Sequence, residues 1–385
     1  MRQIVRAGDA SAHPLVRRHP LVTAAVVVSL VALGGWTIAA SEPEPDPIVR
    51  LAECLPYEEP TSVDDLNDVV ATYRAQPAFQ GGDVGASATL SDGRRLWVFG
   101  DTLRSPGYGT QRMVRNSMLV FGDGCATVVE SRDNGPVVPD RADGVGYWPM
   151  SIAAVPRDGH DVVGVMMQRV RTVGDGAMGF ENLGPAVAEF RVEPGGVPVL
   201  QRVRDLGPDD PDKTKPSWGA AMVVDGEDLL LYGTATIDDP YVFGWSLHVA
   251  RTTIGKVHEP DTWDIVEQPL IPAADGVSQT LSVFEQDGTW YALSKKADFV
   301  GDELVVWTAP SPTGPFTERP ALAQIPSTTD HWLYMPLAHP QMLPEDGSMI
   351  VSVSQNSPDL DAVIDNPLLY RPRFLRVDLP PASGD

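Results

Sequence analysis

GDVGASATL, residues 82–90, and RLWVFGDT, residues 95–102, are two β-rich runs on either side of the turn sequence SDG at 91–93. A short turn makes such runs antiparallel neighbours, so the start of the first lies beside the end of the second. Asp83 and Asp101 therefore meet at one sheet edge, each beside a glycine that lets the backbone pass close to a ligand. They form a candidate acid–base pair. The alternative is that each carboxylate bonds backbone amides at the end of its strand.

The same pattern recurs along the chain as a small or polar lead-in, an apolar strand, an Asp-Gly-type turn and a second strand. The five units begin at Asp83, Trp148, Ser217, Ser278 and Met335. Successive starts are about 56 to 70 residues apart, which is typical of four-stranded blades. We therefore predict an all-β fold, a five-bladed β-propeller over residues 75–380, whose first strands line a central channel. A β-sandwich is the second choice, but it does not account for the repeat.

Composition restricts the partners. The chain has 385 residues, of which 52 are acidic and 29 basic, and its formal net charge is −23. Such a surface repels phosphate backbones and anionic lipid headgroups, so nucleic acid is not expected as a partner. A neutral or cationic ligand fits better, and we expect a monomer.

The N-terminal region predicts export. Residues 1–20 form a basic segment that we place in the cytoplasm, and residues 21–40 are an apolar run of the length that a membrane-spanning helix needs. The run is either an uncleaved transmembrane anchor, which we favour, or a signal peptide. We therefore predict a cell-membrane protein with an extracytoplasmic domain, or a secreted one if the segment is cleaved. Residues 41–74 are a linker and lead-in with a short helix.

The two cysteines, Cys54 and Cys125, are the only ones in the sequence. In an oxidising compartment they are expected to form one disulfide between the lead-in and the first sheet. Two buried free thiols are the alternative.

Several short motifs resemble the domain-of-unknown-function family 4185. They are LWVFGDT at 96–102 after Gly82-Asp83, Asn116-Ser117, Trp148-Pro149, Trp218-Gly219-Ala220, Val249-Ala250-Arg251 and Ala338-His339-Pro340. The resemblance implies a five-bladed propeller over residues 75–378, related in shape to arabinanase, xylosidase and fructosidase propellers. Some members of that family are endo-D-arabinanases that act on mycobacterial-type arabinan, and the resemblance implies the same activity for this chain. Carried over to this sequence, it makes Asp83 and Asp101 the catalytic carboxylates.

Glycoside cleavage requires such a pair, one carboxyl group protonated and the other ionised. Two carboxylates that repel each other have pKa values that are split in this way. Related arabinanase propellers have a third acid, often Glu, at a later lead-in. Here the later lead-ins are Ser217-Trp218, Ser278-Gln279 and Met335-Pro336. Either the two aspartates suffice, or the chain has lost the equipment of an enzyme.

Five further residues are candidates for substrate binding: Asn116, Trp148, Trp218, His339 and Tyr334. Aromatic faces at the channel would stack on sugar rings, although packing between blades explains them nearly as well. Asn116 either bonds a sugar hydroxyl or caps a turn. His339 either faces the channel or is a buried histidine bonded to the backbone.

No phosphate-binding loop, nucleophile elbow or His/Cys metal spacing is present in the sequence. We expect no cofactor; a structural calcium ion in the channel is the alternative, which no residue pattern supports. The main hypothesis is an exported glycoside hydrolase that cleaves furanosidic, D-arabinan-like polysaccharide of the cell envelope. The alternatives are a non-catalytic carbohydrate-binding or envelope-assembly propeller and a protein-interaction propeller.

Overall fold

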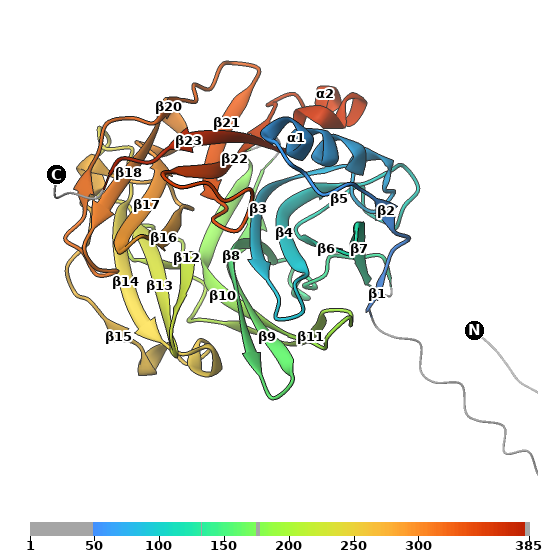
Figure 1. Cartoon of the computed structure of the whole chain (residues 1–385), viewed down its shortest axis with the longest axis horizontal. Coiled ribbons are helices and arrows are strands. Elements are labelled where there is room, and N and C mark those ends of the chain that lie inside the picture. Colours follow the sequence, from blue (N-terminus) through green and yellow to red (C-terminus); the bar gives the residue numbers. More distant parts are fainter. Residues whose placement is uncertain (1–48, 132, 175–177, 382–385) are drawn as a thin grey trace, which may run out of the picture. The chain divides into compact units, whose positions relative to one another are not determined.

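The structure, a computed structural model, describes residues 49–131, 133–174 and 178–381 (Figure 1). In this part of the chain the strands form five antiparallel sheets. The innermost strand of each sheet contacts that of the next, and the last contacts the first, so these strands close a ring. In ring order they are β3 (Gly81–Thr89), β8 (Gly146–Arg157), β12 (Ser217–Asp225), β16 (Ser282–Gln286) and β21 (Trp332–Ala338).

Each sheet continues outward from its inner strand. The first adds β4 (Arg95–Leu103), β6 (Ser117–Gly122), β7 (Cys125–Ser131) and β1 (Val49–Leu51), with β5 (Met113–Val114) on β4 and β2 (Leu55–Pro56) on β7. The second adds β9 (His160–Thr172), β10 (Phe180–Val192) and β11 (Val199–Asp205). The third adds β13 (Asp228–Ala235), β14 (Ser246–Thr252) and β15 (Asp264–Ile265). The fourth adds β17 (Thr289–Lys295), β18 (Glu303–Ala309) and β19 (Thr317–Glu318), with β20 (Ala323–Gln324) on β18. The fifth adds β22 (Ser348–Asn356) and β23 (Pro372–Asp378).

Helices are short. The two α-helices are α1 (Val63–Thr72) and α2 (Leu360–Asp365). The 3₁₀ turns are η1 (Tyr73–Ala75), η2 (Ile254–Lys256), η3 (Pro260–Thr262), η4 (Ala273–Asp275), η5 (Asp298–Val300) and η6 (Pro367–Leu369).

Hairpin turns and packing between sheets explain this arrangement. Asp287 and Gly288, between β16 and β17, both have positive φ, the backbone that a two-residue hairpin turn requires. Apolar side chains fill the space between neighbouring sheets. Val98 and Met118 of the first sheet pack in one buried cluster with Val165 and Phe190 of the second. Burial of the apolar faces of the strands therefore holds adjacent sheets together.

The prediction of an all-β, propeller-like fold is confirmed, but the prediction of a five-bladed propeller with four strands in each blade is wrong. Four sheets have four strands or more, whereas the fifth has three. Helix α1 lies against β23, where a fourth strand would pair. The Asn67 side chain donates to the Phe374 carbonyl at 3.1 Å and accepts from the Phe374 amide at 2.9 Å. One side-chain amide thus satisfies main-chain groups that a strand would otherwise satisfy.

The predicted membrane segment, residues 21–40, lies outside the described residues. Within residues 49–381 as described, none of the helices has the length and apolar character needed to cross a membrane.

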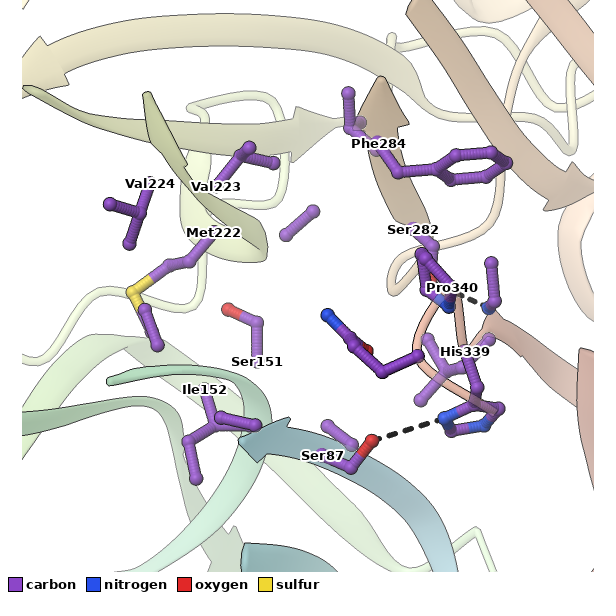
Figure 2. A pocket seen from close by; sticks show the side chains of 18 of the residues that line it. Ser87, Ser151, Ile152, Met222, Val223, Val224, Ser282, Phe284, His339 and Pro340 are labelled. Atoms are coloured by element: carbon purple, nitrogen blue, oxygen red, sulfur yellow. Dashed lines mark hydrogen bonds between the residues drawn. The ribbon is translucent and has the colours of Figure 1, made fainter. Parts of the chain in front are cut away.

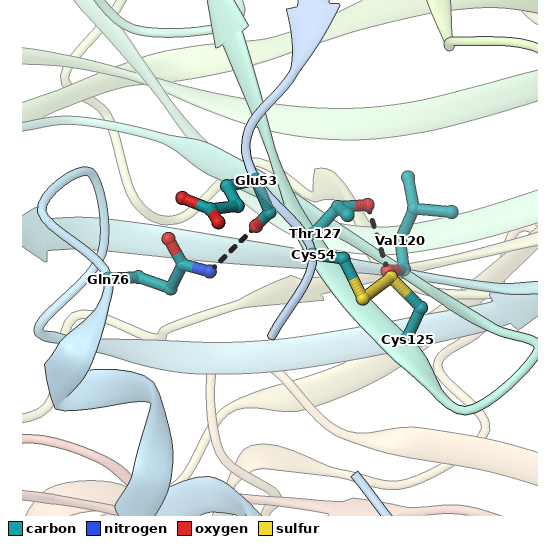
Figure 3. Close-up of a disulfide and its surroundings, with 6 residues drawn as sticks. All are labelled: Glu53, Cys54, Gln76, Val120, Cys125 and Thr127. Carbon is teal, nitrogen blue, oxygen red and sulfur yellow. Dashed lines mark hydrogen bonds between the residues drawn. A yellow bond between two sulfur atoms is a disulfide. The ribbon is translucent and has the colours of Figure 1, made fainter. Parts of the chain in front are cut away.

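The predicted disulfide between Cys54 and Cys125 is present (Figure 3). It joins the segment between β1 and β2 to the start of β7, and β2 pairs with β7 beside it. The Gln76 side chain donates to the Glu53 carbonyl at 3.0 Å on the other side of the segment. The lead-in is therefore held to the first sheet by a covalent link and by hydrogen bonds.

Replacing both cysteines by serine should lower the free energy of unfolding by about 4 kcal/mol. The bond spans 71 residues of sequence, and closing a loop of that length restricts the unfolded chain by about this amount. Urea unfolding of the wild type with and without reductant measures the effect. The reduced wild type should match the double variant, and equal midpoints for the oxidised and reduced wild type would contradict the prediction.

Candidate active site

A bulge in β3 brings the two aspartates together. Gly82 pairs with Thr102 and Val84 pairs with Phe99, so Asp83 alone lies opposite Gly100 and Asp101. A side chain at position 100 would clash with Asp83 Oδ1, so glycine there lets the Asp83 carboxyl lie across β4. The first sequence prediction, that the hairpin joins the two acids at one edge, agrees with this register.

The bulge holds strained backbone. Val84 has φ of 68°, a left-handed conformation that is unusual for a β-branched residue and costs about 1–3 kcal/mol. Two contacts hold it, one with β22 of the fifth sheet and one with the residue that follows η6. The Val84 amide donates to Ser354 Oγ at 3.0 Å, and the Gly82 amide donates to the Tyr370 carbonyl at 3.0 Å. The ring of sheets is thus closed where the carboxyl pair forms.

Two tyrosines lie against Asp83: Tyr334 of β21 and Tyr370, which follows η6. The Tyr334 hydroxyl donates to Asp83 Oδ2 at 2.7 Å, and the Tyr370 hydroxyl also bonds this carboxyl. Burial disfavours the charged form and raises the pKa of Asp83 to about 6, although the two hydroxyl groups oppose the shift. Asn356 contacts the other side of the Tyr334 hydroxyl at 3.4 Å.

Asp101 is held from the second sheet. The Trp148 indole donates from Nε1 to Asp101 Oδ1 at 2.7 Å. Burial, followed by the nearby charge of Asp83, raises the pKa of Asp101 to about 7, whereas Trp148 and Arg115 oppose the shift. Phe180 contacts the Trp148 ring edge-to-face at 4.6 Å between centroids, which fixes the indole that holds the acid.

The arrangement gives two neighbouring carboxyl groups with unequal proton affinities. Both side chains keep part of their surface open to solvent. Around neutral pH the pair holds about one proton, and burial and mutual repulsion favour its presence on Asp101. Such a pair can donate a proton on one side of a bond and act as base or nucleophile on the other.

The predicted binding residues divide into two groups. Trp148 and Tyr334 lie at the carboxyl pair. Trp218 lies at the start of the next inner strand, β12, and its ring contacts that of Trp263 edge-to-face, with 5.9 Å between the ring centroids. Asn116 and His339 do not lie with them. Asn116 is buried; its amide donates to the Val138 and Tyr147 carbonyls and accepts from the Val138 amide. It braces the main chain, so it is not part of the site.

His339 follows β21 at the opposite end of the inner strands from Asp83. It is buried and bonded to Ser87 Oγ at 3.1 Å and Ser352 Oγ at 2.8 Å, and it stacks on Trp97. Burial lowers its pKa to about 3, so the ring is neutral. His339 lines a cavity of about 700 Å³ inside the ring, together with hydroxyl and apolar side chains from the later parts of the inner strands (Figure 2). Neither Asp83 nor Asp101 lines this cavity.

Comparison with known proteins places the chain in a family. A model described as "Domain of unknown function (DUF5005)" matches residues 70–379. The chain belongs to the DUF5005 family. The resemblance to family 4185 is therefore not confirmed, and the reason is that its motifs are short hairpin signals that many β-propellers can share. No curated protein matches the sequence.

Solved structures share the fold of this DUF5005 domain. A putative hydrolase from Bacteroides ovatus ATCC 8483 is similar with a TM-score of 0.59 and 17% identity, over 85% of this chain and 93% of that chain. A glycoside hydrolase family 43 arabinoxylan arabinofuranohydrolase from Bacillus subtilis has a TM-score of 0.49 and 14% identity, over 80% of this chain and 65% of that chain. The first likeness shows the fold alone, and the second is too weak to carry an argument.

Some residues of the DUF5005 site escape sequence reasoning. Tyr370 follows η6, outside any strand, and no local pattern points to it. Phe299 lies in η5, and its ring contacts that of Tyr334 at 5.8 Å. These residues come from loops, whereas the sequence reasoning rested on the repeated strand starts, which is why it found Trp148 and Tyr334.

Asp101→Asn should stabilise the DUF5005 domain at alkaline pH. An unfolded aspartate ionises near pH 4 but folded Asp101 does so near pH 7, so wild-type stability falls as the pH rises between these values. At pH 8 the free energy of unfolding of the variant should exceed that of the wild type by about 2 kcal/mol. This is roughly half of what the whole pKa difference would give, because the side chain is partly exposed. At pH 3.5 the two proteins should be equal. Urea unfolding at both pH values measures this, and an equal or lower stability at pH 8 would contradict it.

Proposed function

We propose that the domain is an exported glycoside hydrolase that cleaves furanosidic, D-arabinan-like polysaccharide of the cell envelope with Asp83 and Asp101. The observation that carries the proposal is the carboxyl pair itself. Two aspartates from one hairpin are close enough to interact, both have raised pKa values, and both remain open to solvent. The export part of the proposal rests on the apolar run at residues 21–40.

Each aspartate has a separate role in this proposal. Asp101, with the higher pKa, is the general acid that protonates the leaving oxygen. Asp83 is ionised at a lower pH and acts as nucleophile or base at the anomeric carbon. Trp148 and Tyr334 orient the two carboxyl groups through single 2.7 Å hydrogen bonds. An oxocarbenium-like transition state develops positive charge, which the ionised carboxylate stabilises.

Three further observations support the proposal. Aromatic side chains lie beside the pair, and such faces stack on sugar rings. The Bacteroides ovatus protein with the same fold is described as a putative hydrolase. A net charge of −23 also suits a neutral polysaccharide better than a polyanion.

One observation favours the alternative, a carbohydrate-binding or envelope-assembly domain without catalysis. The later inner strands begin with Ser217-Trp218 in β12 and Trp332 in β21, so neither supplies a third acid there. In this alternative the same groups would bind a glycan and leave it intact.

Assays of hydrolysis by the Asp83→Asn and Asp101→Asn variants distinguish a hydrolase from a non-catalytic binding domain. Incubation with arabinan, arabinogalactan and other envelope glycans should release oligosaccharides from the wild type, and each variant should be slower by roughly 10²- to 10⁴-fold. Asp346→Asn, in an exposed turn, is the matched control and should keep full activity. Chromatography of the products measures the rates. A folded wild type that releases nothing from any glycan would leave the binding domain as the better description.

The pH profile tests the roles. Activity should rise through about pH 6 as Asp83 ionises and fall through about pH 7 as Asp101 loses its proton. Tyr334→Phe removes a hydrogen bond to ionised Asp83, so the pKa of Asp83 should rise and the acidic limb should move to higher pH. Tyr291→Phe, whose hydroxyl bonds the Pro380 carbonyl, is the control and should leave both limbs in place. An acidic limb that stays put in Tyr334→Phe would contradict the role of Asp83.

A further inference from the structure

A cleft of about 260 Å³ lies between the second and third sheets. It begins beside the carboxyl pair, because Gln168, which lines it, pairs in register with Trp148, and Trp148 holds Asp101. Its lining combines three indoles with three side-chain amides: Trp218, Trp245, Trp263, Gln168, Asn182 and Gln279. Aromatic faces with a few amide groups are a lining suited to sugar rings and their hydroxyls.

Two polar groups of this cleft lack partners among the described residues. The Asn182 carbonyl oxygen is buried without a hydrogen bond, although a buried polar atom usually has one. The Trp218 side chain is only half-buried, and its indole N–H donates to no described group. In contrast, the indoles of Trp245 and Trp263 donate to Asp298 and to the Lys256 carbonyl. A ligand hydroxyl could accept from Trp218 and, after a small rotation of the amide, donate to Asn182.

The backbone at Asn182 is irregular as well. Strand β10 loses its register with β9 between Asn182 and Pro185, and Gly184 has φ of 98°. Such bulges re-aim side chains and occur next to functional sites. Here the bulge lies at the cleft, because Asn182, Gly184 and Pro185 all line it.

Two of the three cations that line the cleft, Arg169 and Lys215, are paired with carboxylates, whereas Lys213 is exposed and has no ion pair among the described residues. Lys215 bonds Asp210 at 2.5 Å and lies 3.6 Å from Asp212, and buried Arg169 bonds Asp209 at 2.7 Å. These pairs offset most of the charge at the cleft, and the Trp218 indole and the Asn182 amide remain as its recognition groups, which favours a neutral, hydroxylated ligand over a phosphate or a carboxylate.

We propose that this cleft is a sugar-binding subsite that holds a neutral pentose or hexose unit of the polysaccharide away from the bond at Asp83 and Asp101. The inference rests on the proposed function for its substrate, but its ligand chemistry comes from the cleft alone. A chain bound at both places spans more than one sugar, so the domain takes internal stretches of a polymer rather than a single terminal unit. Longer oligosaccharides therefore bind more tightly than disaccharides.

Calorimetric binding in the Asp101→Asn background separates this subsite from hydrolysis. The probes are arabino-, xylo- and galacto-oligosaccharides of two to eight units. Asn182→Leu removes the unpartnered amide at nearly constant size, and Trp218→Phe removes the N–H but keeps an aromatic ring. Each should lower the affinity for long oligosaccharides by about 3- to 10-fold and leave the affinity for disaccharides unchanged. Trp290→Phe, outside the cleft, should change neither. Asn182→Leu should fold normally, since it removes a buried oxygen that has no partner.

The outcomes distinguish the two proposals. Affinity that is independent of length, or equal in the cleft variants and the control, would overturn the subsite even if the wild type cleaves arabinan. Length-dependent binding that both cleft variants weaken, in a domain that cleaves nothing, would support the subsite and overturn the hydrolase. No binding of any of the three series to folded protein would overturn the subsite together with its sugar ligand.

Discussion

The site depends on one irregular pairing, the bulge that places Asp83 opposite Gly100 and Asp101. A regular ladder would send successive side chains to alternate faces and would not give Asp83 this place across β4. The bulge requires left-handed backbone at Val84, and a hydrogen bond with the fifth sheet holds it there. The first and last sheets therefore meet at the point where the chemistry is proposed. The contacts that close the ring also hold the backbone that positions the carboxyl pair.

The two carboxyl groups differ because different sheets hold them. The hydroxyl of Tyr334 in the fifth sheet and that of Tyr370 after η6 stabilise the charge of Asp83, whereas a single indole of the second sheet bonds Asp101. Burial raises both pKa values, and the charge of Asp83 raises that of Asp101 further. An isolated hairpin would carry two ordinary aspartates in water. The packed sheets make them an unequal pair.

The two ends of the ring have different chemistry. The end with the carboxyl pair carries indoles, phenols and amides, and the cleft at Asn182 extends this surface toward the third sheet. The other end encloses the cavity in Figure 2, where His339 is neutral and bonded to two serines. A polymer that lies across the first end would meet both the proposed acids and the proposed subsite without entering this cavity.

The presence of only two cysteines predicted the disulfide. Local patterns in the sequence determined the hairpins, the repeated units and the meeting of Asp83 with Asp101, because turn residues and strand alternation act over a few residues. They also pointed to Trp148 and Tyr334, since both lie near the starts of inner strands. Only the tertiary structure decided the rest. Helix α1 and Asn67 replace an outer strand of the fifth sheet. Asn116 and His339 form their hydrogen bonds with buried groups of the interior. Tyr370 reaches Asp83 from a loop. These outcomes depend on contacts between residues as far apart as Asn67 and Phe374. The packing of the sheets also decides which buried polar groups have hydrogen-bond partners. The side-chain oxygen of Asn182 has none among the described residues.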